Sequence, residues 1–194
     1  TAIGANSAST GAFTTLSATG NSTVGGTFGV TGATTLNGGL TLNSSSISLG
    51  TNSTSSGSNS TALGYNSTAS GNNSIAIGAS TANNSGSIAI GNSASSTGGD
   101  SVSLGGQASA SGTDSVALGG NASATAQNSY AIGKSASAGH SDSIAIGSSA
   151  ETTGANQIVL GTSNETTIIK GDLTTNGTST LSTVDINGGA IDGT

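Results

Sequence analysis

Large apolar, small and polar residues alternate in a five-residue phrase that recurs through the middle of the chain. The phrase is SIAIG from Ser74 to Gly78 and SVALG from Ser115 to Gly119, with large residues at its second and fourth positions. Nine such phrases lie between residues 46 and 161, and the 14-residue step between them is constant except for the step that ends at Gly91, which is one residue shorter. A fixed period of this kind predicts a solenoid of stacked coils.

Each repeat contains two candidate β-strands. Alternation within the phrase indicates a first strand with one face of large side chains and one face of Ala or Ser. A second strand follows, with small residues three and five positions after the Gly, as at Ala108 and Ala110. We expect the large residues to form the repeat core and the Ala/Ser face to pack against neighbouring protomers. The predicted core residues are Ile75, Ile77, Ile88, Ile90, Val102, Leu104, Val116, Leu118, Ile132, Ile144, Ile146, Ile158 and Leu160.

Two corners complete each coil. The first corner begins at the repeat Gly, predicted as a turn at Gly64, Gly78, Gly91, Gly105, Gly119, Gly133, Gly147 and Gly161. A further Gly, seven residues on in several repeats, suits a backbone with positive φ; these are Gly57, Gly71, Gly98, Gly112 and Gly154. The second corner lies where Asn, Asp or Gly precedes the phrase, because Asn and Asp tolerate the left-handed region and can hydrogen-bond their own backbone.

The flanks lack the repeat period. Residues 1–45 and 162–194 carry single apolar residues among Thr and Gly, which predicts short, irregular or intertwined β segments on either side of the roll at 46–161. One coil buries two large side chains and a few Ala, which is little apolar area to offset the entropy of ordering the whole coil. We therefore predict an obligate oligomer.

Composition excludes several classes of function. The chain has 2 Lys and no Arg, a formal net charge of −6 and no Cys, so a nucleic-acid or thiolate metal site is not expected. No apolar run approaches the roughly 20 residues of a membrane span, so no membrane insertion is expected in this segment. With no Met, the chain is interpreted as an excerpt of a longer protein or a processed one.

The repeat array resembles the head repeats of the YadA-like trimeric autotransporter adhesins. DSVSLGGQASASGTDSVALG, from Asp100 to Gly119, carries the resemblance, which extends over about residues 46–161. It implies an all-β, left-handed parallel β-roll of 14-residue coils that forms a homotrimer. The flanking segments at 11–39 and 182–194 are instead similar to shaft repeats of phage tail fibres.

Candidate chemistry is sparse. His140, the single His, is expected to face water at a corner, and we expect neither catalysis nor a cofactor. Asp100, Asp114 and Asp142 stack in one column and could bind Ca²⁺, but the six to eight oxygen ligands of such sites favour corner capping instead. Tyr65 and Lys134, each just after a repeat Gly, are possible surface contacts, as is His140, whereas Tyr130 is expected in the core.

Together these features predict a non-enzymatic, rigid spacer within an elongated homotrimeric fibre. The favoured context is an extracellular phage tail fibre, part of the virion, that attaches to a host-cell surface glycan or protein and contributes weak surface contacts. The first alternative is the head of a bacterial trimeric autotransporter adhesin on the outer surface of the cell. An extracellular structural filament and an ice- or polysaccharide-binding ladder are further alternatives.

Overall fold

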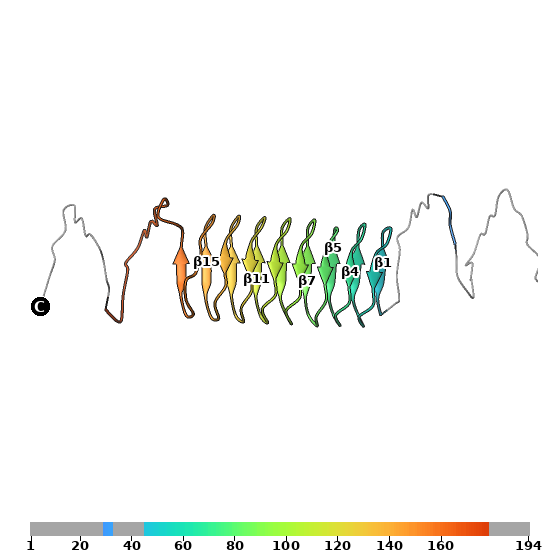
Figure 1. Ribbon diagram of the computed structural model, residues 1–194, viewed down its shortest axis with the longest axis horizontal. Coiled ribbons are helices and arrows are strands. Elements are labelled where there is room, and N and C mark those ends of the chain that lie inside the picture. The colour runs from blue at the N-terminus through green and yellow to red at the C-terminus, as the bar shows by residue number, and fades with distance from the viewer. Residues whose placement is uncertain (1–28, 33–44, 179–194) are drawn as a thin grey trace, which may run out of the picture. The chain divides into compact units, whose positions relative to one another are not determined.

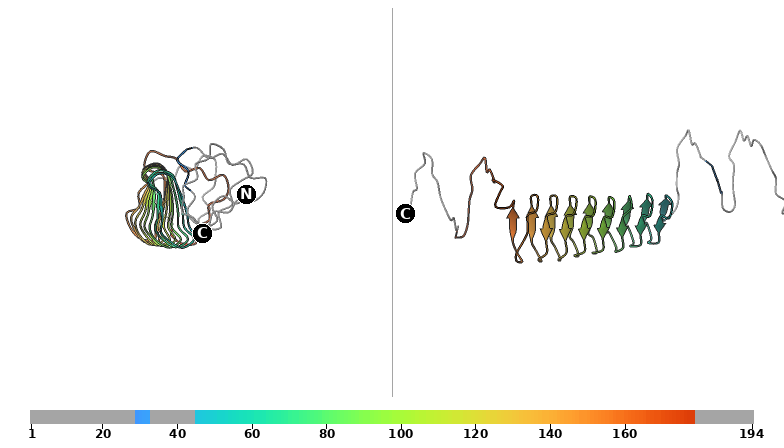
Figure 2. Two further views of the ribbon diagram at one scale, coloured as in Figure 1. Left: turned by 90° about the vertical axis from the view of Figure 1, so that its right-hand side faces the viewer. Right: turned by 45° about the horizontal axis from the view of Figure 1, so that its top comes forward.

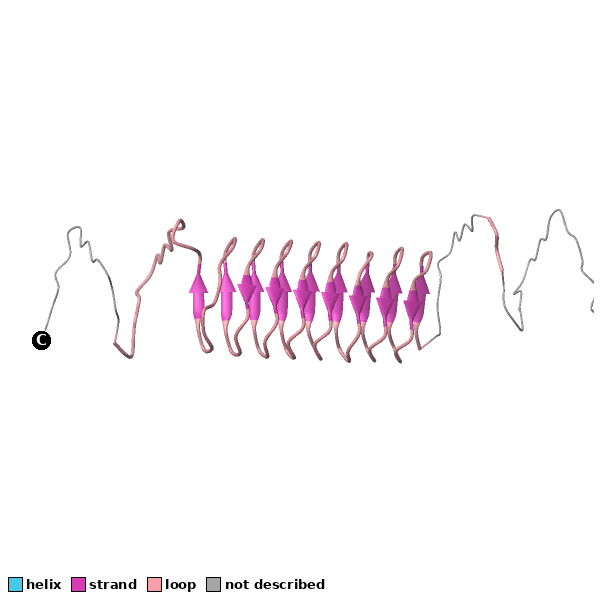
Figure 3. Ribbon diagram, in the orientation of Figure 1, coloured by secondary structure: helices cyan, strands magenta, loops and turns pink. Residues whose placement is uncertain are grey.

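The computed structural model describes residues 29–32 and 45–178. Two units divide the chain at residues 41 and 42, and all strands that the structure describes belong to the second unit. This unit is a parallel β-roll without helix in its described residues, as Figure 1 and Figure 3 show. The prediction of an all-β parallel solenoid is confirmed. The predicted shaft segment at 1–45 lies largely outside the described residues, as do residues 179–194 of the second one, whereas residues 162–178 are described and contain no strand.

Sheet A contains the phrase strands. Its nine members are consecutive neighbours in the order of the chain. They are β1 (Ile47–Leu49), β3 (Thr61–Leu63), β5 (Ile75–Ile77), β7 (Ile88–Ile90), β9 (Val102–Leu104), β11 (Val116–Leu118), β13 (Tyr130–Ile132), β15 (Ile144–Ile146) and β16 (Ile158–Leu160).

Sheet B contains the second strand of each coil and has seven members. They are β2 (Thr54–Ser55), β4 (Thr68–Ala69), β6 (Thr81–Ala82), β8 (Ser95–Ser96), β10 (Ser109–Ala110), β12 (Ser123–Ala124) and β14 (Ser137–Ala138). A single bridge between Ser137 and Glu151 continues this sheet by one coil.

Every strand pairs in parallel with its equivalent in the next coil. Val116 lies opposite Val102 on one side and Tyr130 on the other, so like repeat positions stack in columns. Seen along the roll, the coils superimpose (Figure 2). A column therefore presents the same repeat position once per rung, about 4.8 Å apart.

The interior between the sheets is filled by small side chains. Ala117 of β11 and its neighbours Ala110 and Ala124 of sheet B are 0% exposed, and Ser103 fills the Ala117 column one coil earlier. Strands of three and two residues joined by tight corners hold the sheets so close that the largest fully buried side chains are Thr and Ser, and Val159 at the end of the Ala117 column is only partly buried. The prediction that the Ala/Ser face packs between protomers is therefore wrong.

The large side chains lie on the outer face of sheet A. Leu118 is 42% exposed and Ile146 is 38% exposed. The prediction that the large residues form the core of the coil is wrong for the chain itself, because alternation along the strand directs them away from the second sheet. Of the predicted core, Ile90, Leu118, Ile146, Ile158 and Leu160 are exposed, and Ile75, Ile77, Ile88, Val102, Leu104, Val116, Ile132 and Ile144 are half-buried.

The repeat glycines form the first corner, as predicted. All eight predicted turn glycines have positive φ, between 77° at Gly161 and 136° at Gly91. A Cβ at Gly119 would also lie 2.5 Å from the carbonyl oxygen of Gly133 in the next coil. Both the backbone angle and the close approach of successive coils thus require Gly.

The glycines seven residues further on have a different role from the predicted one. Gly57, Gly71, Gly98, Gly112 and Gly154 lack positive φ. At the first four of these, a Cβ would lie 1.9 to 2.0 Å from a carbonyl oxygen of the next coil. Close stacking of coils, not a left-handed backbone, explains these four glycines, whereas a Cβ at Gly154 would meet only the Gln157 side chain.

Left-handed residues occur at both corners. The prediction of a left-handed column before the phrase is confirmed by φ values from 52° at Asp100 to 68° at Gly86. A second left-handed column, two residues after the repeat Gly, was not predicted. It consists of Asn52, Asn66, Ser93, Gln107, Asn121, Ser135 and Ser149. Ser and Gln are weak signals for this conformation, so composition gave little indication of the column.

Candidate functional site

The outer side of sheet A, called here the apolar face, is the main unpartnered surface of the described roll. Its side chains occupy two columns, one through Val116 and one through Leu118, along nine paired strands. No charged residue lies on these strands, although Tyr130, expected in the core, is 36% exposed here. An uncharged apolar surface of this length is typical of an interface between protein chains.

The outer side of sheet B, called here the hydroxyl face, has a different chemistry. Thr and Ser side chains, most of them half-buried, form one column along its strands, and Glu151 continues the column after β14. The members of the column on the strands are Thr54, Thr68, Thr81, Ser95, Ser109, Ser123 and Ser137. The two faces of the roll therefore differ sharply in polarity.

Buried serines stabilise the second corner. The Oγ of Ser115 donates to the carbonyl of Gly112 at 2.6 Å, and the Oγ of Ser101 donates in the same way to Gly98 at 2.8 Å. Only Ser74 in this column has a buried Oγ without a partner among the described residues. The leading Ser of the phrase is thus a structural residue, a role that sequence reasoning missed although its near-invariant spacing was visible.

Asn and Asp side chains form ladders along the same corner. Asn59 donates through Nδ2 to Oδ1 of Asn73 at 3.4 Å, and Asn128 donates to Asp142 at 2.8 Å. Within residues 29–32 and 45–178, no group of three His, Cys, Asp or Glu side chains could hold a metal ion. Asp100 and Asp114 occupy neighbouring positions in this column, where corner geometry accounts for their side-chain type.

The prediction that His140 faces water is wrong for part of its side chain. The side chain is half-buried, and its Nδ1 is buried without a hydrogen-bond partner among the described residues. Its carbonyl accepts a bond from the Oγ of Ser143 at 2.5 Å. Asp142, the acidic residue nearest to His140 in sequence, accepts a hydrogen bond from Asn128. The described residues therefore assemble no acid–base pair around His140.

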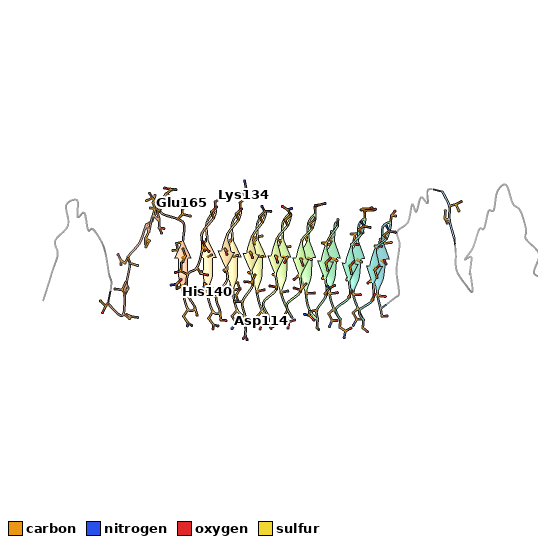
Figure 4. The ribbon with its side chains drawn as sticks, in the orientation of Figure 1. Asp114, Lys134, His140 and Glu165 are labelled. Atoms are coloured by element: carbon orange, nitrogen blue, oxygen red, sulfur yellow. The ribbon has the colours of Figure 1, made fainter. Side chains whose placement is uncertain are left out.

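The other predicted surface residues lie at the first corner. Lys134 extends from the edge of the roll opposite to the one that carries His140 and Asp114 (Figure 4). Tyr65 occupies the same repeat position as Lys134 and is 62% exposed. The three predicted contact residues are thus not brought together into one site.

The last coil ends in a polar turn. Oε1 of Gln157 accepts bonds from the amides of Thr153 and Gly154, each at 2.9 Å. The carboxylate of Glu165 accepts from both the hydroxyl and the amide of Thr162. These bonds, from the side chain first and the backbone second, lower the pKa of Glu165, whereas slight desolvation opposes them.

A family model and a solved structure point to the same protein family. A family model described as the YadA head domain repeat matches residues 43–67, 55–81, 69–94, 96–122, 124–150 and 141–163. The crystal structure of the collagen-binding domain of the Yersinia adhesin YadA matches with a TM-score of 0.51 and 28% identity. That match covers 75% of this chain and 94% of the other. No curated protein sequence matches, and the described residues include no helix able to cross a membrane.

Proposed function

Since this chain belongs to the family of YadA head domain repeats, we propose that it is the adhesive head segment of an elongated homotrimeric surface fibre. The observation that carries the proposal is the apolar face, which remains open along the strands of sheet A in the single chain. Three copies packed through these faces bury two columns of large side chains each. Burial of such side chains provides the free energy that the thin Ala/Ser interior lacks.

The trimer leaves the hydroxyl face and the corners as the outer surface. These regions carry Ser, Thr and Asn with few charges, which keeps the fibre in solution without a strong electrostatic preference. The similar Yersinia domain is named as collagen-binding. We propose collagen or another extracellular matrix protein as the partner of this chain, with contacts through the outer surface and no catalytic step.

We propose the bacterial outer surface as the location. The head-repeat match supports an adhesin of the autotransporter type over a phage tail fibre. The tail-fibre hypothesis rests on residues 11–39 and 182–194, of which the structure describes only 29–32. It stays a prediction, as do the domain limits at 45/46 and 161/162. Immunogold labelling separates the two: label on intact bacterial cells supports the adhesin, and label on purified virions supports the tail fibre.

Sedimentation equilibrium tests the oligomer directly. We expect a mass of three chains for the wild type and dissociation for Leu118→Asp, because packing would bury three unpaired carboxylates. Ser123→Asp, on the hydroxyl face, is the matched control and is expected to remain trimeric. A monomeric, folded wild type, or a trimeric Leu118→Asp variant, contradicts the proposed packing.

Binding is tested separately on the full 194-residue chain. Surface plasmon resonance over immobilised triple-helical collagen should give saturable binding by the trimer and much weaker binding by dissociated Leu118→Asp, because three linked copies act with avidity. Heat-denatured collagen on a reference channel controls for nonspecific adsorption. Equal binding to native and denatured collagen, or none to either, removes collagen as the partner and leaves the trimeric fibre segment intact.

A further inference from the structure

One corner of the roll is shorter than the others. In a full corner, the amide three residues after the repeat Gly donates to the carbonyl of that Gly, as from Ser67 to Gly64 at 3.5 Å. In the shortened coil the donor is the amide of Ser80, only two residues after the Gly, which donates to the carbonyl of Gly78 at 2.8 Å. The paired strands remain in register, with Thr68 opposite Thr81. The missing residue therefore belongs to the left-handed column of this corner.

The deletion leaves a backbone acceptor unpaired. In full corners, the left-handed residue donates its amide to the preceding coil, from Asn66 to the carbonyl of Thr51 at 3.0 Å and from Ser149 to that of Lys134 at 2.9 Å. The equivalent donor to Tyr65 is the deleted residue, and no other donor from the described residues reaches the Tyr65 carbonyl. Tyr65 is 62% exposed, so its carbonyl is open to a hydrogen bond from water or from a ligand.

The shortened corner lies between two exposed side chains. Tyr65 occupies the position after the repeat Gly one coil earlier, and Asn92 occupies it one coil later, so they are separated by two rungs, roughly 9.6 Å. Ala79 stands at that position between them. We call the region bounded by Tyr65, Ala79 and Asn92 the notch. The corners that contain it follow β3, β5 and β7 along one edge of the roll (Figure 1).

The groups around the notch are complementary to a polyol. Tyr65, a residue that is 62% exposed, offers the apolar face of its ring, and its carbonyl has no donor among the described residues. Asn92 uses its Oδ1 to accept from Ser93 at 3.2 Å, and its Nδ2 has no partner among the described residues, so it can donate. A pyranose presents C–H groups on one face and hydroxyls at its edge, which suits a ring, an acceptor and a donor in this arrangement.

The absence of charged side chains around the notch favours an uncharged ligand. No Asp, Glu, Lys or Arg occurs before Asp100, so the coils around the notch carry no charged side chain. A sialylated or sulfated sugar and a charged peptide find no counter-ion there. We propose that the notch is a subsite for one neutral pyranose residue of a surface glycan. This adds a ligand to the proposed adhesive head and depends on neither collagen binding nor trimer formation.

The test is saturation-transfer difference NMR with the full chain and three neutral probes: the methyl pyranosides of galactose, glucose and mannose. We expect at least one to bind with Kd on the order of 1 mM, and the methyl glycoside of N-acetylneuraminic acid to bind at least about tenfold more weakly. Tyr65→Ala should weaken binding of the neutral probe about tenfold, because the ring contact is lost. Lys134→Ala, the same position in a full corner, should leave it unchanged.

A second variant tests the notch itself and retains the aromatic ring. Insertion of one Asn between Ala79 and Ser80 restores the regular coil length, supplies the missing donor to the Tyr65 carbonyl and should abolish binding. Asn92→Ala provides an independent measurement if the insertion variant fails to fold. Binding of no neutral probe, equal binding by Tyr65→Ala and the wild type, or preferred binding of the sialoside overturns the proposal. Neither a monomeric chain nor absence of collagen binding affects it.

Discussion

Replacement of Ala117 by Leu should destabilise the roll although both residues are apolar. Ala117 is 0% exposed, and it packs with the small residues of both sheets. Leu adds three carbon atoms in a space where the largest fully buried side chains are Thr and Ser. Such overpacking typically costs about 1–3 kcal/mol, and the thin interior puts the expected cost at the upper end, about 3 kcal/mol. For a chain of this size that lowers Tm by about 6–12 °C.

Circular dichroism melts at equal protein concentration measure the effect. Ala117→Ser is the matched control, because Ser103 fills the same column and its Oγ donates to the carbonyl of Ser95 at 2.6 Å. We expect the Ser variant to stay within about 1 kcal/mol of the wild type. An Ala117→Leu variant that melts within about 2 °C of the wild type would refute the assignment of Ala to the interior.

Three further predictions concern the corners. Gly119→Ala should cost about 2 kcal/mol or more in urea unfolding, on the order expected for a strained backbone with a clash, whereas Gly120→Ala, with no atom closer than 3.8 Å, should cost little. Asp114→Asn should raise the urea midpoint by the equivalent of about 0.5 kcal/mol at low salt and by less in high salt, because it relieves repulsion in the Asp column. The bonds that lower the pKa of Glu165 stabilise its turn above the ordinary carboxyl range, so the protection factor of the Thr162 amide, which is corrected for the slower intrinsic exchange in acid, should fall as pH drops through that lowered pKa; an unchanged protection factor down to complete protonation would contradict this.

The 14-residue period of the sequence was sufficient to predict the coils. The residue types before the phrase were sufficient to predict the left-handed backbone at one of the two corners. A constant step with a strand on each side of a Gly admits few folds, and Asn or Asp before the phrase has a direct physical reason to be left-handed. The second left-handed column escaped prediction because Ser93, Gln107 and Ser135 lack that preference. At that column the backbone hydrogen bonds between successive coils, not the type of residue, determine the left-handed conformation.

Alternation could not determine which face of a strand is interior. In a single sheet packed on a core, large residues point inward, and that assumption led to the prediction that residues such as Ile77 form the interior of the coil. The distance between two sheets decides the matter, and it depends on how few residues the corners contain. Ala fits between these sheets and Ile does not, so the small face is interior.

The notch shows the same dependence on coil geometry. From the sequence, Tyr65 and Lys134 were equivalent, since both follow a repeat Gly, and the one shortened step was only an irregularity of the period. The structure separates them: the carbonyl of Lys134 accepts the amide of Ser149, and that of Tyr65 has no such donor among the described residues. In a repeat protein each coil contacts only its neighbours, so deletion of one residue alters a single corner and leaves the remaining ladders intact. A defect in a regular array thereby creates a local chemistry that the repeat itself does not contain.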